Sequence, residues 1–182
     1  MNYPIDITNV TLKTKRLVLR PFKLTDLDDL FEYASVNGVG QMAGWLPHKT
    51  KADSLFILNM FIDSKNQFAL VYNNKVIGSL GIEKYNEAQF EELHDYKVRE
   101  IGYVLSKDYW GNGLMPEAVK AVIDYLFNEV KLDALLCGYF TYNKRSQAVS
   151  KKCGFTFYKN ILCTYPIGND IECVMTILKN TR

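Results

Sequence analysis

Apolar residues recur along the chain with two different periods, and the change of period separates predicted strands from predicted helices. Alternating apolar and polar residues over Arg16–Phe22 predict an edge strand that ends near Pro21. Two more apolar runs, at residues 68–72 and 76–82, flank Asn73-Asn-Lys75. A short Asn-rich connection between two such runs is typical of a β-hairpin.

The second half of the chain contains four more predicted strands. The first two are expected at residues 98–105 and 134–140, and the latter contains so few polar atoms that we expect it in the middle of a sheet. The last two, residues 155–167 and 171–178, are expected to form a closing hairpin that turns at residues 168–170.

Four helices are predicted where apolar residues return every three or four positions. Thr25 and Thr50 are the expected N-caps of the first two. The third and clearest helix is expected over Pro116–Glu129, and the fourth over Asn143–Lys152 with Gly154 just beyond its end. The apolar face of the third helix consists of Val119, Val122, Ile123, Leu126 and Phe127. The predicted order is β-α-α-β-β-β-α-β-α-β-β.

Composition restricts the class of protein. The chain has 182 residues, a net charge of +2, 48% hydrophobic and 23% charged residues, which is ordinary for a globular domain, so we expect one domain over residues 1–182. The small net charge argues against a nucleic-acid partner. No apolar run is long enough for a membrane span, and the first residues lack a secretory signal, so we expect a cytoplasmic location.

The cysteines and histidines indicate no metal site. The four cysteines form no C-x-x-C pair, and only two histidines accompany them. We expect reduced and mostly buried thiols.

The most informative segment joins a predicted strand, Glu100–Ser106, to a glycine-bearing loop and a helix that we expect to begin at Pro116. Such a junction directs several main-chain N–H groups toward one point at the positive end of the helix dipole, which favours a phosphate or pyrophosphate. A Walker loop is absent, and the dinucleotide-binding pattern fails because Pro116 stands at its third small-residue position.

Two motifs in these settings resemble the GCN5-related N-acetyltransferase (GNAT) family. The first is Trp110-Gly-Asn-Gly113-Leu-Met115 between a strand and a helix, and the second runs from Asn143 through Ser146 to Gly154-Phe155. Trp110 stands where the family usually has Gln or Arg, and Met115 where it has Gly or Ala.

Within the family, the chain is most similar to the ribosomal-protein N-terminal acetyltransferases. The segments that carry this similarity are Thr14–Phe22, Glu100–Tyr103 and Trp110–Ala118. The resemblance implies an α/β (α+β) GNAT fold: one mixed, mostly antiparallel, twisted sheet of about seven strands, splayed at the cofactor site, with about four helices. It also implies acetyl-coenzyme A as cosubstrate and no metal.

The resemblance also implies which residues contact the cosubstrate. The loop would offer main-chain N–H groups to the pyrophosphate, Val104 and Leu105 would pair with the pantetheine arm through their amides, and the side chain of Asn143 would contact that arm. Asn143 has an alternative role as a helix cap. The expected cofactor-binding residues are Val104, Leu105, Trp110, Gly111, Asn112, Gly113, Leu114, Met115 and Asn143.

Two residues are the candidates for catalysis. Glu100 would be the base that deprotonates the amine, with the alternative that it is a solvated or ion-paired carboxylate beside Arg99. Ser146 would hydrogen-bond the departing thiolate, with the alternative that it only satisfies backbone donors at a helix start. Trp45 either lines the acceptor cleft or belongs to the core. A basic cluster either meets the ribose 3′-phosphate or is a solvated helix face. It consists of Lys144, Arg145, Lys151 and Lys152.

Three functions follow from the resemblance. The leading one is acetyl transfer from acetyl-coenzyme A to the N-terminal amine of a protein, in a ternary complex. The second keeps the reaction but takes a small amine such as a polyamine or an antibiotic, and the third is a coenzyme A-binding sensor without catalysis. A homodimer is a further expectation.

Overall fold

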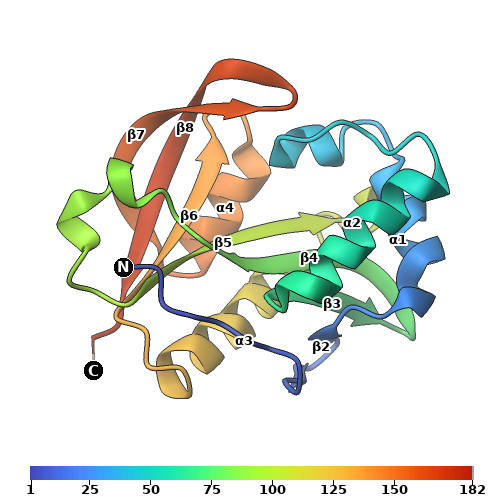
Figure 1. Cartoon of the computed structure of the whole chain (residues 1–182), viewed down its shortest axis with the longest axis horizontal. Helices are drawn as coiled ribbons and strands as arrows, with labels where there is room; N and C mark the ends of the chain where they lie inside the picture. Colours follow the sequence, from blue (N-terminus) through green and yellow to red (C-terminus); the bar gives the residue numbers. More distant parts are fainter. Residues whose placement is uncertain (182) are drawn as a thin grey trace.

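Eight strands join one twisted sheet in the computed structural model, which describes residues 1–181 (Figure 1). The strand order is β1-β2-β3-β4-β5-β6-β8-β7, and every neighbouring pair is antiparallel except β5 and β6. The strands are β1 (Leu12–Lys13), β2 (Val18–Pro21), β3 (Gln67–Tyr72), β4 (Lys75–Glu83), β5 (Val98–Leu105), β6 (Ala134–Phe140), β7 (Thr156–Tyr165) and β8 (Gly168–Lys179). The mixed, mostly antiparallel sheet is confirmed, and the two-residue β1 is the strand that the prediction lacks.

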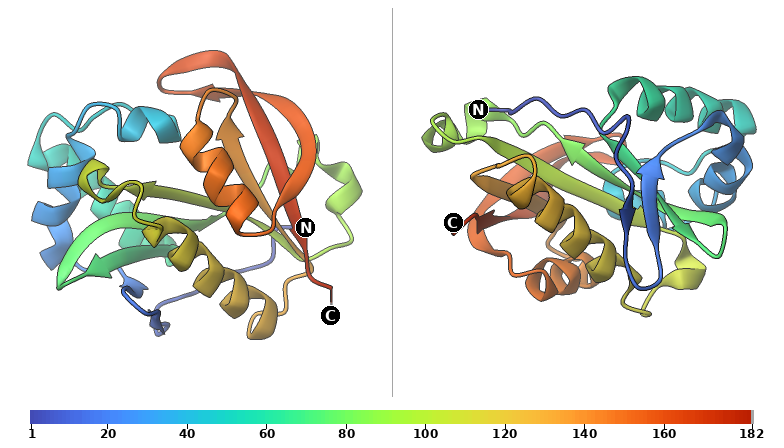
Figure 2. Two further views of the ribbon diagram at one scale, coloured as in Figure 1. Left: turned by 180° about the vertical axis from the view of Figure 1, so that it is seen from behind. Right: turned by 90° about the horizontal axis from the view of Figure 1, so that it is seen from below.

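The helices form a layer on each face of the sheet. Helices α1 (Leu27–Ala34) and α2 (Lys51–Ser64) cover one face, and α3 (Leu114–Asn128) and α4 (Lys144–Lys152) cover the other (Figure 2). Five single 3-10 turns complete the regular structure. They are η1 (Leu24–Asp26), η2 (Gly40–Ala43), η3 (Glu87–Gln89), η4 (Glu91–Leu93) and η5 (Lys107–Tyr109).

Two predicted helix starts are wrong, for different physical reasons. Thr25 lies inside η1 and does not cap α1. The Asp26 carboxylate accepts from the Lys23 N–H and pairs with Arg20, and α1 begins after Asp26, at Leu27. Helix α3 begins at Leu114 rather than Pro116. Pro116 is tolerated there because the first N–H groups of a helix have no intrahelical acceptor.

The other termini follow the prediction more closely. Thr50 caps α2 through a reciprocal pair of hydrogen bonds with Asp53. Gly154 follows the end of α4 with a φ of +88°. The predicted turn of the last hairpin is wrong, because Tyr165 already pairs with Gly168 and the chain reverses at residues 166–167.

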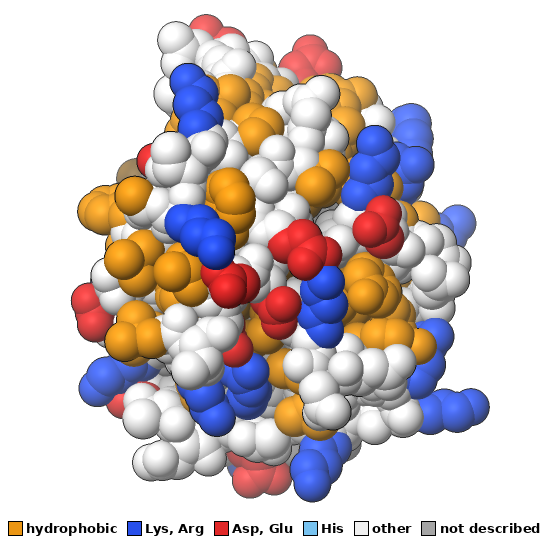
Figure 3. Space-filling view, turned by 90° about the vertical axis from the view of Figure 1, so that its right-hand side faces the viewer, with side chains coloured by type: hydrophobic (Ala, Val, Ile, Leu, Met, Phe, Trp, Pro, Cys, Tyr) orange, Lys and Arg blue, Asp and Glu red, His pale blue; other side chains and the backbone are white. Residues whose placement is uncertain are grey.

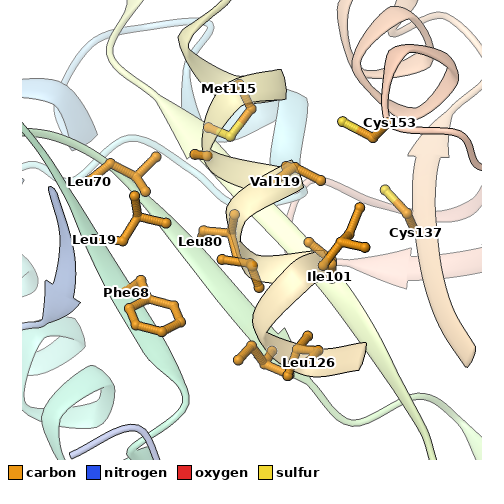
Figure 4. Packing of buried hydrophobic residues seen from close by; sticks show 14 of the residues in the cluster. Leu19, Phe68, Leu70, Leu80, Ile101, Met115, Val119, Leu126, Cys137 and Cys153 are labelled. Atoms are coloured by element: carbon orange, nitrogen blue, oxygen red, sulfur yellow. The ribbon is translucent and has the colours of Figure 1, made fainter. Parts of the chain in front are cut away.

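The main core lies between the sheet and α3 (Figure 4). Leu19, Phe68, Leu70, Leu80 and Ile101 project from four strands toward the helix. The helix meets them with the predicted apolar face, of which Val119, Val122, Ile123 and Leu126 are buried and Phe127 is half-buried. Apolar burial of this kind contributes about 25 cal/mol for each Å² removed from water, so α3 is held rigidly against the sheet.

The opposite layer is less completely buried. Helix α2 buries Leu58 but exposes Leu55, Phe56 and Met60, and hydrophobic side chains on this side of the molecule lie among acidic and basic ones (Figure 3). All four cysteines are free thiols, three of them buried, as expected. Among residues 1–181, no helix is both long and apolar enough to cross a membrane.

Candidate functional site

Strands β5 and β6 separate after their first three residue pairs. The pairs are Val98–Ala134, Arg99–Leu135 and Glu100–Leu136, whereas β5 stays paired with β4 as far as Leu105. Strand β6 meanwhile remains paired with β8. Beyond Glu100, one edge of β5 therefore faces a gap in the sheet rather than a partner strand.

A cavity of about 330 Å³ occupies this gap. Its walls include residues of η2 and of the starts of α3 and α4. Every predicted site residue except Asn112 lines it. The side chain of Asn112 instead donates to the carbonyls of Tyr109 and Trp110, and the main-chain carbonyl of Asn112 accepts a hydrogen bond of 2.9 Å from Arg16.

The glycine loop has the shape that the anion-site prediction requires. Gly111 and Gly113 have φ values of +79° and +73°, a conformation that side chains strongly disfavour. Gly113 is the N-cap of α3, so the free N–H groups of the first turn and the positive end of the helix dipole meet at the cavity wall.

Trp110 ties this loop to the end of β5. Its indole N–H donates to the Leu105 carbonyl at 2.7 Å, and the Arg145 guanidinium lies over the indole ring, 4.6 Å from its centroid. Trp110, which stands where the family usually has Gln or Arg, therefore connects the glycine loop to the end of β5 and to α4.

The open edge of β5 presents the main-chain groups of alternate residues. The Ser106 N–H donates to Ile77 on the β4 side, so alternation directs the polar groups of Val104 toward β4 and those of Tyr103 and Leu105 toward the gap. Tyr103, rather than Val104, therefore shares the open edge with Leu105, although Val104 lines the cavity.

Glu100 lies where the two strands part. Its Oε1 atom would be 3.3 Å from a Cβ atom added to Gly138 of β6, so the absence of a side chain there leaves room for the carboxylate. Burial, with a smaller contribution from Glu83 opposite it, raises the pKa of Glu100 to about 7. A carboxyl group with this pKa can accept a proton near neutral pH.

The alternative for Glu100, an ion pair with Arg99, is not what the structure shows. No salt bridge to Glu100 occurs among residues 1–181. Arg99 is only 4% exposed, and its Nε and Nη1 atoms have no hydrogen-bond partner within that part of the chain.

The start of α4 brings Asn143 and Ser146 to the cavity. Asn143 caps the helix, because its Oδ1 atom accepts from the Ser146 N–H at 3.1 Å, and its Nδ2 atom donates to the Met42 carbonyl at 3.1 Å. The capping role is therefore present, and the amide also links α4 to η2. The Ser146 hydroxyl lies 2.9 Å from that of Tyr103.

The remaining candidates differ in whether they line the cavity. In the basic cluster, Arg145 and Lys152 line the cavity, whereas Lys144 and Lys151 do not. Trp45 packs over Gly40 and does not line the cavity. No group of three or more His, Cys, Asp or Glu side chains in residues 1–181 is arranged to hold a metal ion.

No motif in the sequence indicates one end of the cavity. This end, called the acceptor end for the role proposed below, is lined by Val39, Met42, Phe140, Cys163, Tyr165, Cys173 and Met175. Tyr165 packs against Gly44, where an added Cβ would be 2.5 Å from its ring, so the β7–β8 hairpin meets the loop after η2. Two other residues of the cavity wall, Gly138 and Tyr103, carried a signal in the sequence. Gly138 is a glycine inside a predicted central strand, and Tyr103 is a tyrosine two residues before Leu105 in another predicted strand.

The chain is similar to known proteins in sequence and in fold. The family model of the acetyltransferase (GNAT) domain matches residues 16–156. The uncharacterized N-acetyltransferase p20 of Bacillus licheniformis is 30% identical over 132 residues, which cover 69% of this chain and 70% of that protein.

Two solved structures share the fold. A GNAT-family acetyltransferase from Bacillus anthracis has a TM-score of 0.81 and 21% identity over 95% of this chain and all of that one. A ribosomal-protein-S5-alanine acetyltransferase from Vibrio fischeri has a TM-score of 0.71 and 22% identity over 95% and 98% of the two chains.

Proposed function

The chain belongs to the GNAT family of N-acetyltransferases, which transfer an acetyl group from acetyl-coenzyme A to an amine, and we propose that its acceptor is the N-terminal amine of a protein. The observation that carries the proposal is that Glu100 is the one carboxylate in the cavity wall of the described chain.

The residues that are present suit acetyl-coenzyme A. The loop at Gly111 and Gly113 offers main-chain N–H groups to a pyrophosphate. The open edge offers the main-chain groups of Tyr103 and the N–H of Leu105 to the amides of pantetheine, whereas the Leu105 carbonyl already accepts from Trp110. Arg145 and Lys152 supply positive charge beside the same cavity, where the ribose 3′-phosphate would lie. When bound, the thioester supplies the acetyl group and a thiolate that can leave.

The walls of the acceptor end disfavour a polycation. Met42, Phe140, Tyr165 and Met175 are apolar or aromatic, whereas a polyamine would need several carboxylates to replace its hydration. An amine with a single charge and an apolar neighbour is the better match to one carboxylate in such walls.

The proton affinity of Glu100 supports the same acceptor. Its pKa of about 7 lies about one unit below that of an α-amine and more than three units below that of a lysine side chain. Each unit costs about 1.4 kcal/mol, so removing a proton from an α-ammonium group is much less unfavourable.

The proposed roles follow from position. Glu100, directly or through a water molecule, accepts the proton that the attacking amine loses. An N–H group on the open edge near Leu105 faces the oxygen atom that gains negative charge. Ser146 donates a hydrogen bond to the departing sulfur. The Vibrio fischeri protein, named for an alanine of ribosomal protein S5, supports a protein acceptor on the same fold.

An acceptor screen tests the proposal. Purified protein and acetyl-coenzyme A are incubated with ribosomal-protein N-terminal peptides, polyamines and aminoglycosides, and both thiol release and acceptor mass are measured. We expect acetylation at the peptide α-amine, with a kcat/KM at least tenfold above that for any small amine.

The matched control is the same peptide with a blocked N-terminus and a free internal lysine, which should not react. Turnover of small amines alone would contradict the proposal. Tight binding of acetyl-coenzyme A without turnover of any amine would instead indicate the sensor.

A further inference from the structure

The hydroxyl group of Tyr103 lies between two functional groups that belong to other elements. It is 2.9 Å from Ser146 Oγ and 3.3 Å from the Ser146 carbonyl, both on α4, and 3.9 Å from Cys137 Sγ on β6. Tyr103 and Ser146 both line the cavity, whereas Cys137 is buried beneath it. Tyr103 is therefore a second contact, besides Asn143, that determines how Ser146 meets the cavity.

The direction of these hydrogen bonds follows from the available donors. A phenol has one hydrogen to donate, and both of its strong acceptors here are oxygens of Ser146. Cys137 donates from the other side through its weak S–H group. The Tyr103 hydrogen therefore goes to an oxygen of Ser146, of which Oγ, at 2.9 Å, is nearer than the main-chain carbonyl, at 3.3 Å.

If Tyr103 donates to Ser146 Oγ, the Tyr103 oxygen no longer competes for the hydrogen of the Ser146 hydroxyl. When Ser146 Oγ accepts from Tyr103, its own hydrogen remains to be donated, and Tyr103 is its single side-chain partner within residues 1–181. A serine in a helix often donates back to a carbonyl one turn earlier, which would remove the hydrogen from the cavity. The Tyr103 hydrogen bond works against that rotation.

We propose that Tyr103 is a positioning residue, which donates to Ser146 Oγ and thereby directs the Ser146 hydrogen at the sulfur atom that gains negative charge as the thioester C–S bond breaks. The electron pair of that bond goes to sulfur, the proton of Ser146 stays on its oxygen, and the proton of the attacking amine goes to the base. The inference rests on the proposed role of Ser146, but not on the identity of the acceptor.

Tyr103 can donate throughout the range in which the enzyme would work. Burial raises its pKa well above the ordinary value of 10, so the phenol keeps its hydrogen at neutral and moderately alkaline pH. Any effect of removing the hydroxyl should therefore be independent of pH between about 6 and 9.

The test is a double-mutant cycle of Tyr103→Phe and Ser146→Ala, with thiol release measured at saturating acetyl-coenzyme A and a saturating amine. One hydrogen bond between neutral groups corresponds to about a 3- to 10-fold change in rate. We expect Tyr103→Phe to lower kcat by this factor while the KM for acetyl-coenzyme A changes less than twofold. In the Ser146→Ala background, the same substitution should have no effect beyond twofold.

Tyr72→Phe is the matched control, because Tyr72 is a half-buried tyrosine that contacts Tyr109 and does not line the cavity. It should leave kcat unchanged. If circular dichroism shows that Tyr103→Phe is unfolded, Tyr103→Leu, which also lacks the hydroxyl, replaces it in the cycle.

An unchanged kcat in the folded Tyr103 variant would overturn the proposal. So would an equal loss in both Ser146 backgrounds, because Tyr103 would then act without the serine. A screen in which only small amines react would contradict the proposed acceptor but leave this cycle measurable, because thiol departure is common to every amine.

Discussion

The side chain of Asn143 joins α4 to a loop that lies 101 positions earlier, through a 3.1 Å hydrogen bond from its Nδ2 atom to the Met42 carbonyl. The same side chain accepts from the Ser146 N–H through Oδ1. Met42 and Ser146 both line the cavity. One amide therefore connects two residues of the cavity wall that belong to η2 and α4.

Asn143→Asp should separate these two functions. Aspartate caps a helix as well as asparagine but has no hydrogen for Met42, so we expect the KM for the amine to rise about fivefold while the dissociation constant of acetyl-coenzyme A stays within twofold. Steady-state kinetics and titration calorimetry measure the two constants. A large loss of acetyl-coenzyme A affinity would instead show that Asn143 contacts the cosubstrate, as the sequence analysis expected.

Glu100→Gln should reduce turnover and change its pH dependence. Positioned general bases contribute about 100-fold or more, so we expect kcat to fall by at least that factor with little change in affinity for acetyl-coenzyme A. The wild-type rate should rise as pH increases through about 7, where Glu100 ionises. As a control, Glu83→Gln should move that midpoint to lower pH, because it removes the neighbouring charge. A wild-type rate in Glu100→Gln at every pH would exclude the role.

Glu100→Gln should also stabilise the fold at high pH. The pKa of Glu100 is about 7 in the folded chain, above its ordinary 4.5, so the folded state binds more protons than the unfolded state between these values. The free energy of unfolding of the wild type therefore falls as pH rises from about 4.5 to 7, by up to about 3 kcal/mol from this group. Urea denaturation at pH 4.5 and 8 should show Glu100→Gln gaining stability relative to wild type only at pH 8. A difference independent of pH would contradict the assigned pKa.

Gly113→Val should abolish binding of acetyl-coenzyme A. A valine at a φ of +73° is strained by about 1–3 kcal/mol and adds bulk at the cavity wall where the N–H groups converge. Gly154→Val is the matched control, because Gly154 has a φ of +88° and does not line the cavity. We expect thermal unfolding to show similar losses of stability for both, and calorimetry to show lost binding for Gly113→Val alone. Normal binding by that variant would refute the anion site.

Arg16→Ala should weaken the cosubstrate site from outside it. Arg16 donates to the Asn112 carbonyl at 2.9 Å and pairs with Glu117 in the first turn of α3 at 2.7 Å, so it holds the glycine loop against the helix. We expect the dissociation constant of acetyl-coenzyme A to rise several-fold, with about 1 kcal/mol lost from the free energy of unfolding. The neighbouring exposed Lys15→Ala is the control, and equal effects of the two would mean that charge alone is responsible.

Much of the fold could be predicted because its signals are local. The apolar runs of β3 and β4, the apolar face of α3 and the Thr50 cap each depend on residues a few positions apart. The errors are also local, but they depend on competition between neighbours. Thr25 is not the N-cap of α1, because Arg20, six positions before Asp26, holds the Asp26 carboxylate and the helix begins after Asp26.

The candidate site could be predicted only in part. Its glycine loop and its two catalytic candidates lie in motifs, so their types and spacing are visible in the sequence. The acceptor end is not visible in the sequence, because it is assembled from η2, β6, β7 and β8, and no short pattern connects these elements. Val104 illustrates the limit, since which edge a strand residue faces is set by its register with β4.

The sequence by itself determined the elements, the loop that suits a pyrophosphate and the residues able to carry the chemistry, because each depends on spacing within one segment. Only the tertiary structure decided that β5 and β6 part after Glu100, that Gly138 leaves room for its carboxylate, and that Tyr103 and Asn143 hold Ser146 from two sides. These contacts join different strands and helices. They exist because packing of the whole sheet sets its register, which local propensity does not encode.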